Sequence, residues 1–187
     1  MPLELILYPH EVLREVCTPV EMEEIEGPTR EGGRLFILPP EIKEFCEELN
    51  KSLYHYNGQG LAAPQVGKTI RVFSLLLSDE AICFINPEVT EFLGNPIKIK
   101  EGCLSLPGVR AATKCRNDYI SIRATDLLGE EFDKKLMLIE AVAFQHELDH
   151  LDGKVLFNRM GQAQRQLKKN SYLKKIKKWR RYREQAR

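Results

Sequence analysis

Residues 145 to 150 read Gln145-His146-Glu147-Leu148-Asp149-His150, and this run decides the centre of the fold. Histidines four residues apart lie one above the other on the same face of a helix. From that face both imidazoles can reach one metal ion, and Glu147 between them can transfer protons. The run therefore favours a helix with a metal hydrolase site over an ordinary surface helix that happens to contain two histidines.

The flanks of the run are typical of a helix with one face on a core and another on a pocket. Residues 140–151 contain no Gly or Pro, and a glycine follows as a stop signal at Gly153. One stripe suits core packing and consists of Phe144, Leu148 and Leu151. A second stripe combines the two histidines with Ile139, Val142 and Ala143. It suits a metal site at the floor of an apolar pocket, although core packing of its apolar residues is an alternative.

Length and composition bound the class of protein. The chain has 187 residues and is 43% hydrophobic, which predicts one domain with a substantial core. No apolar run is long enough to span a membrane, and the first residues lack the pattern of a secretory signal. Five scattered cysteines do not predict a disulfide framework. We therefore expect a cytoplasmic protein with no membrane partner.

Charge divides the chain into two parts. Residues 163–187 contain eleven Lys or Arg residues and one acid, a net charge of +10, whereas residues 1–162 have a net charge of −9. We expect residues 1–162 to form a catalytic domain and residues 163–187 to form a basic helical extension.

The remaining patterns predict an α+β fold. Pro40 can start a helix over residues 40–56, and the Gly- and Pro-rich residues 21–40 are expected to form a long loop. Strands are expected at residues 70–77, 81–85, 88–92, 97–100, 119–125 and 131–138, with Asn86-Pro87 ending the second. Strands followed by one late helix favour mostly antiparallel sheets around the central metal-binding helix, with the basic helix at the C-terminal end.

A catalytic zinc-type site takes three protein ligands and leaves one position open. The candidate for the third ligand is Cys103, within Glu101-Gly102-Cys103-Leu104-Ser105. A thiolate suits zinc or ferrous iron. On its own, however, a cysteine is more often an inert buried thiol.

A loop of small residues supplies a further candidate. It reads Gly58-Gln59-Gly60-Leu61-Ala62-Ala63-Pro64-Gln65. Small side chains let a backbone approach a ligand, and the amide of Gln65 can donate to a developing oxyanion. A tight packed turn is the alternative for this loop.

The segments 58–65, 101–105 and 145–150, in this order along the chain, resemble the peptide deformylase family. Tyr8-Pro9 with Val12-Leu13-Arg14, and Leu151-Asp152-Gly153 after the helix, are also similar to that family. The resemblance covers about residues 3–160. It implies an enzyme that removes the formyl group from the N-terminal methionine of newly made polypeptides and releases formate.

The resemblance also implies roles for residues. The metal ligands would be Cys103, His146 and His150, and Glu147 would be the general acid and base. Gln65 and the backbone N–H of Leu104 would form the oxyanion hole. The substrate would be bound by Gly60, Arg110, Ile139, Val142 and Ala143. The family's metal is typically Fe²⁺, with Zn²⁺, Ni²⁺ or Co²⁺ also accepted, so one divalent ion per chain is expected, Fe²⁺ in the cell.

Two residues depart from the family pattern. Gln59 stands where the family usually has Val or Ile. Cys115 stands where an arginine is common that supports the glutamate equivalent to Glu101. Because Lys114 and Arg116 flank it, the supporting charge can come from one position away.

The basic tail allows three interpretations. A helix over residues 171–183 places Tyr172, Ile176 and Trp179 on one stripe. This stripe can pack on the body of the protein, and it is narrow for a membrane-surface helix. Dense Lys and Arg with interleaved aromatics also suit RNA. Given the nascent-chain substrate, we expect contact with ribosomal RNA near the peptide exit.

Two other functions remain as alternatives at this point. A metalloprotease shares the two-histidine motif, but such enzymes rarely use a cysteine as the third ligand. A non-catalytic RNA- or ribosome-binding protein with a structural metal suits the tail, but its closed site would need a fourth protein ligand.

Overall fold

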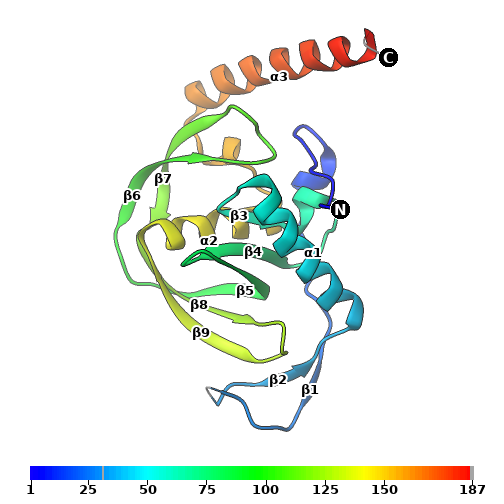
Figure 1. The fold of residues 1–187 in the computed structure, drawn as a ribbon. Helices are drawn as coiled ribbons and strands as arrows, with labels where there is room; N and C mark the ends of the chain where they lie inside the picture. Colours follow the sequence, from blue (N-terminus) through cyan, green and yellow to red (C-terminus); the bar gives the residue numbers. More distant parts are fainter. Residues whose placement is uncertain (31, 186–187) are drawn as a thin grey trace.

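The computed structural model describes residues 1–30 and 32–185, and for residues 114, 115 and 179–185 it describes the backbone only. Its centre is an antiparallel sheet with the strand order β3-β4-β5-β8-β9. The strands are β3 Gly60–Ala62, β4 Val72–Leu77, β5 Glu80–Phe92, β8 Tyr119–Thr125 and β9 Glu131–Met137. Helix α2, Leu138–Leu151, lies against this sheet (Figure 1). The α+β class with antiparallel sheets around the motif helix was predicted correctly.

Helix α2 is central because its apolar stripe belongs to a core cluster that it shares with the main sheet. Phe144 is fully buried, and its ring lies 5.0 Å from that of Phe73 and 5.5 Å from that of Phe84. Leu151 is also fully buried, and Leu148 packs against the same cluster. This packing fixes the orientation of the opposite stripe, which contains the two histidines.

Helix α1, Pro40–Tyr56, leads the chain to the edge strand β3. Pro40 occupies the first turn, where its missing N–H is tolerated, as predicted. Phe45, Leu49 and Leu53 are buried in a second core cluster. Asn57 ends the helix in a left-handed conformation, so that the small-residue loop begins directly beside the sheet.

A separate two-stranded antiparallel ribbon consists of β6, Pro96–Gly102, and β7, Arg110–Asn117. We call it the β6–β7 ribbon. Its register shifts between two pairs, because Ile97 lies opposite Arg116 whereas Ile99 lies opposite Thr113. One residue of β6 therefore faces two residues of β7, which is a β-bulge. The sequence predicted most of β6 and missed β7.

The prediction that Asn86-Pro87 ends a strand was wrong. Strand β5 runs through both residues, with a register shift between Ile85 and Glu88. Asn86 has a φ of 49°, and its side chain binds the backbone of Val20 through bonds of 2.8 and 2.9 Å. This long-range anchor lets the bulged strand continue instead of ending.

The expected loop at residues 21–40 contains a β-hairpin, β1 Glu23–Ile25 and β2 Leu35–Ile37. The hairpin docks on the turn between β8 and β9, where the Phe36 N–H donates to the Gly129 carbonyl at 2.8 Å. Leu128 and Gly129 lie in this turn. Figure 1 shows the hairpin at the end of the molecule opposite the last helix.

The chain ends in α3, Gln162–Gln185, which is longer than the predicted tail helix. Three short 3-10 helices complete the elements of the residues that the structure describes, η1 Glu11–Arg14, η2 Ala63–Val66 and η3 Leu156–Arg159. Tyr172 of α3 is buried against Tyr8 and Phe157, and Ile176 packs on the same cluster. The side chain of Trp179, the third member of the predicted stripe, lies outside the described residues.

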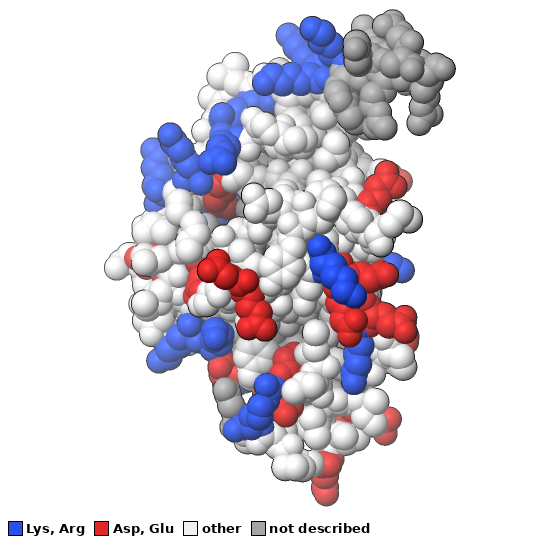
Figure 2. Space-filling model, viewed as in Figure 1, with Lys and Arg blue, Asp and Glu red and all other residues white. Residues whose placement is uncertain are grey.

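Lys and Arg side chains gather along α3 in Figure 2. The division into a domain of residues 1–162 and an extension of residues 163–187 stays a prediction, and the first half of α3 contributes to the core. No helix in the described part of the chain has the length and apolar character needed to cross a lipid bilayer.

Candidate active site

Three candidate metal ligands converge beside α2. His146 and His150 lie one turn apart with ring centroids separated by 5.2 Å, and both are buried. The Sγ atom of Cys103, which follows β6, lies 3.2 Å from Nε2 of His150. One possible ligand atom from each of the three side chains lies within 4.8 Å of the others. This spacing allows the three residues to share one ion.

The protonation state of Cys103 suits a ligand. Burial by itself raises the pKa of the thiol, but the neighbouring imidazoles of His150 and His146 outweigh it and bring the pKa down to about 5. The thiolate is the form of cysteine that binds metals. One soft thiolate and two imidazoles fit a divalent ion such as zinc or ferrous iron.

Glu101 orients the first histidine. Its Oε2 atom lies 2.7 Å from Nδ1 of His146. Burial raises the pKa of Glu101, but hydrogen bonds with His146 and Arg116 lower it to about 2, so the group is a carboxylate. A carboxylate only accepts hydrogen bonds, so Nδ1 donates and Nε2 is left for a ligand role.

Arg116 holds Glu101 in place. Its Nε donates to Oε1 at 3.0 Å and its Nη2 donates to Oε2 at 2.9 Å, while Nη1 reaches Oδ2 of Asp149 at 2.7 Å. The Arg116 side chain is 1% exposed. The hypothesis that the supporting charge comes from beside Cys115 is therefore confirmed. The side chain of Cys115 itself lies outside the described residues.

Glu147 lies against the backbone of the small-residue loop. A Cβ atom at Gly60 would lie 2.5 Å from its Oε1, so any larger residue at this position would displace the carboxylate. The Oε2 atom is buried and has no hydrogen-bond partner among the described residues. Burial raises the pKa of Glu147 to about 7. A carboxylate with a pKa near neutrality can both accept and release a proton under cellular conditions.

Gln65 points its amide nitrogen towards the ligands. Its Oε1 accepts from the Ala62 N–H at 2.8 Å, which fixes the orientation of the amide. Its Nε2 then lies 3.2 Å from Oγ of Ser105 and 3.6 Å from Sγ of Cys103. Leu104, the residue after the candidate ligand, lines the same cavity.

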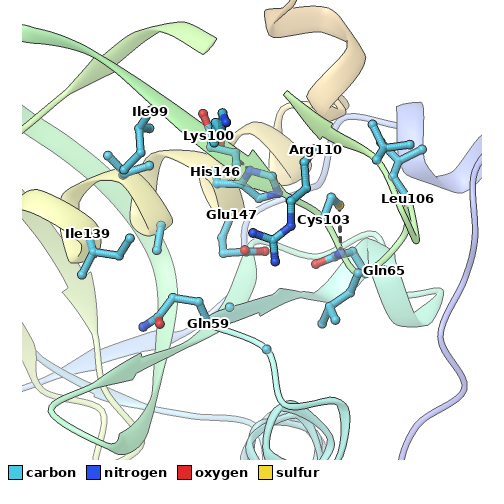
Figure 3. A pocket seen from close by; sticks show the side chains of 18 of the residues that line it. Gln59, Gln65, Ile99, Lys100, Cys103, Leu106, Arg110, Ile139, His146 and Glu147 are labelled. Atoms are coloured by element: carbon cyan, nitrogen blue, oxygen red, sulfur yellow. Dashed lines mark hydrogen bonds and ion pairs between the residues drawn. The ribbon is translucent and has the colours of Figure 1, made fainter. Parts of the chain in front are cut away.

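The cavity in front of these groups has a volume of about 400 Å³. It is lined by all the residues predicted to bind substrate, namely Gly60, Arg110, Ile139, Val142 and Ala143. Val142 and Ala143 are buried, whereas Ile139 is exposed at the mouth. Gln59 also lines the cavity (Figure 3), but its side-chain amide donates to the Leu76 carbonyl at 2.7 Å.

Sequence reasoning missed part of the cavity wall. Strand β6 contributes Ile99 and Lys100, and the loop that connects β6 to β7 contributes Leu106 and Val109. The alternation of Ile and Lys along residues 97–100 predicts a strand with one half-buried face. It does not reveal which part of the molecule that face covers.

A family model described as polypeptide deformylase matches residues 2–166. The chain belongs to the polypeptide deformylase family. It is 35% identical over 180 residues to a peptide deformylase of Hydrogenovibrio crunogenus, with 94% of each chain covered. It is 39% identical over 118 residues to a peptide deformylase of Dictyoglomus thermophilum, with 63% of this chain and 76% of that protein covered.

Solved deformylase structures have the same fold. The structure from Legionella pneumophila superimposes with a TM-score of 0.81 at 26% identity and covers 96% of this chain and 98% of its own. The structure from Thermotoga maritima gives 0.72 at 28% identity, with 86% and 99% covered. The chain is thus an enzyme that removes N-formyl groups from nascent peptides. The metalloprotease and binding-protein alternatives are set aside.

Proposed function

We propose that deformylation by this chain takes place at the cavity beside α2, with Cys103, His146 and His150 as the ligands of one divalent metal. The observation that carries the proposal is the convergence of three ligand atoms next to the carboxylate of Glu147. That carboxylate has a buried oxygen without a hydrogen-bond partner among the described residues. A catalytic site needs such a free acid or base, whereas a structural metal site does not.

The likeness to the family supports Fe²⁺ as the metal in the cell, while one thiolate and two imidazoles suit Zn²⁺, Ni²⁺ or Co²⁺ equally well. When bound, the ion supplies Lewis-acid chemistry, which lowers the pKa of water and polarises a carbonyl oxygen. Glu101 holds His146 through the 2.7 Å hydrogen bond, so the imidazole is oriented before an ion arrives.

Glu147 is proposed as the group that moves the proton. It takes a proton from the water that attacks the formyl carbon and passes it to the nitrogen as the carbon–nitrogen bond breaks. The products are formate and a free N-terminal amine. Gln65 Nε2 and the Leu104 N–H are proposed to donate to the formyl oxygen while negative charge develops on it.

The cavity walls are proposed to select the first residue of the peptide. Val142, Ala143 and Ile139 offer apolar surface for a methionine side chain. Gly60 lies on β3, an edge strand of the main sheet, and its backbone can pair with an extended peptide. Arg110 lines the cavity from the side of the β6–β7 ribbon (Figure 3).

We further propose that α3 binds ribosomal RNA and brings the enzyme to nascent chains. Support comes from the net charge of +10 in residues 163–187 and from the basic surface along α3 in Figure 2. Removal of the whole tail is a poor test, because Tyr172 is buried in the core. Replacing Lys174, Lys175 and Lys178, all exposed, by Glu should abolish salt-sensitive ribosome binding. Equal binding by the variant and the original protein would refute this part of the proposal.

Formate release from a short N-formyl-methionyl peptide tests the proposed site. The protein is purified without oxygen and supplied with Fe²⁺, and the N-acetyl peptide serves as control. Glu147→Ala and the isosteric Glu147→Gln should each retain one metal ion per chain and lose nearly all turnover. Loss of the metal in Glu147→Gln would contradict the role assigned to Glu147. Absence of formate release by the original protein, despite one bound metal per chain, would overturn the proposal.

A further inference from the structure

Two cationic side chains stand at the mouth of the cavity. Lys100 of β6 and Arg110 of β7 both line it, and both are exposed. In the register of the ribbon, Gly102 lies opposite Arg110 and Lys100 lies opposite Ala112. Paired residues and residues two apart share a face of a ribbon, so Lys100 and Arg110 are diagonal neighbours on one face. Figure 3 shows both on the ribbon side of the cavity, across from Gln59.

Among the described residues, no acid at the mouth balances these charges. The acidic residues that line the cavity are Glu101 and Glu147. Glu101 is buried and paired with Arg116, and Glu147 is buried at the floor. Within the described residues, no ion pair includes Lys100 or Arg110. The mouth therefore presents a positive field to whatever leaves the cavity.

The path of a bound peptide leads past these cations. This step rests on the proposed function, which places the formyl group beside Cys103 and the first side chain against Val142 and Ala143. The peptide must then leave between β3 and the β6–β7 ribbon, because α2 closes the floor. An extended chain advances about 3.3 Å per residue, so its second and third residues lie within reach of a lysine side chain at the mouth.

We propose that Lys100, assisted by Arg110, makes the enzyme prefer nascent chains with an aspartate or glutamate at the second or third residue. Lys100 is thus a specificity-determining residue for the part of the substrate beyond the formylmethionine. The contact is a solvent-exposed ion pair, which is weak and is screened by salt. A preference of about threefold at low ionic strength is expected from such a pair.

Four peptides measure this preference. Each begins with formylmethionine, has either Glu or its uncharged isostere Gln at position two or three, has Ala and Ser elsewhere, and ends in an amide. The amide removes the terminal carboxylate, which is a second possible anion. The ratio of kcat/KM for the Glu peptide to that for the Gln peptide should be about three at low salt at one of the two positions. It should approach one in about 0.5 M salt.

Lys100→Gln should bring the ratio to about one, and Lys100→Glu should invert it. Lys98→Gln is the matched control, because Lys98 lies on the same face of β6 but does not line the cavity, and it should leave the ratio unchanged. Equal kcat/KM for the Glu and Gln peptides at both positions at low salt would overturn the inference. So would a ratio that Lys100→Glu leaves unchanged, or one that Lys98→Gln removes as well. No formate release from any peptide would overturn the proposed function, and the inference with it.

Discussion

Arg116 donates hydrogen bonds to both carboxylate oxygens of Glu101, at 3.0 and 2.9 Å. It does so from one residue beyond position 115, where the family usually has arginine. The β-bulge in the β6–β7 ribbon accounts for the shift. Thr113 is fully buried and also donates to Glu101, so β7 faces inward at this residue. Regular alternation would turn Cys115 inward next, whereas the extra residue of the bulge turns Arg116 inward instead.

Arg116→Met is predicted to destabilise the protein strongly. It removes the arginine partner of the buried Glu101 and one of the two arginine partners of Asp149, which keeps Arg159. Breaking a buried pair costs about 3–5 kcal/mol. Metal affinity should also fall by about 10–100-fold, because Glu101 no longer holds His146 firmly. Urea denaturation and chelator competition measure the two effects.

Arg71→Met is the control, because it breaks a partly exposed pair with Asp152 and should cost about 1 kcal/mol or less. Similar losses in both variants would show that the Arg116 pair is not special.

Cys103→Ser is predicted to weaken metal binding by at least about tenfold, because a hydroxyl is a poorer ligand than a thiolate. Competition with a chromophoric chelator measures the affinity. Cys17→Ser is the control, since Cys17 is a buried cysteine in the core, where burial raises the pKa of the thiol to about 11. It should alter stability but not metal affinity. Unchanged affinity in Cys103→Ser would remove this residue from the ligand set.

Tyr172→Phe is predicted to lower the free energy of unfolding by about 1–2 kcal/mol. The Tyr172 hydroxyl lies 3.0 Å from the Tyr8 carbonyl oxygen and 3.4 Å from that of Ser105, and all these groups are buried. Because Gln65 Nε2 donates to the Ser105 hydroxyl, this contact ties α3 to the loop beside the candidate oxyanion hole. In the control Tyr54→Phe, the lost hydroxyl accepts a hydrogen bond from the Ala81 N–H at 2.8 Å. Because Tyr54 is exposed, water can take over this bond, and the change should stay within about 0.5 kcal/mol. Equal stability of Tyr172→Phe and the original protein would show that α3 is only loosely attached.

The parts of the fold that the sequence predicted are those with short-range signals. The spacing of His146 and His150 and the position of Pro40 are signals that lie within a single helix. Helices α2 and α1 were therefore predicted correctly. Strand β7 was missed because its residues, Arg110–Asn117, are mostly polar or small and lack alternating large apolar side chains. The continuity of β5 depends on bonds between Asn86 and Val20, which are 66 residues apart. The position of Arg116 depends on a bulge in strand pairing, which one strand's sequence does not reveal.

Gly129→Ala is predicted to release the β1–β2 hairpin from the β8–β9 turn. Gly129 has a φ of 84°, and a Cβ there would collide with the Phe36 carbonyl oxygen. Gly32→Ala is a matched control, because Gly32 has a φ of 74° but has no atom within 4 Å of such a Cβ. Both variants incur the backbone strain of about 1–2 kcal/mol, so only the collision distinguishes them.

Hydrogen exchange at the Phe36 and Glu131 amides, which bond across this contact, should accelerate in Gly129→Ala alone. The value of kcat should be unchanged in both variants, since none of the described residues 21–30 and 32–38 lines the cavity. Equal exchange rates in the two variants would mean that the hairpin is held by its arginine pairs with Asp126 and Glu131 and not by the close backbone contact.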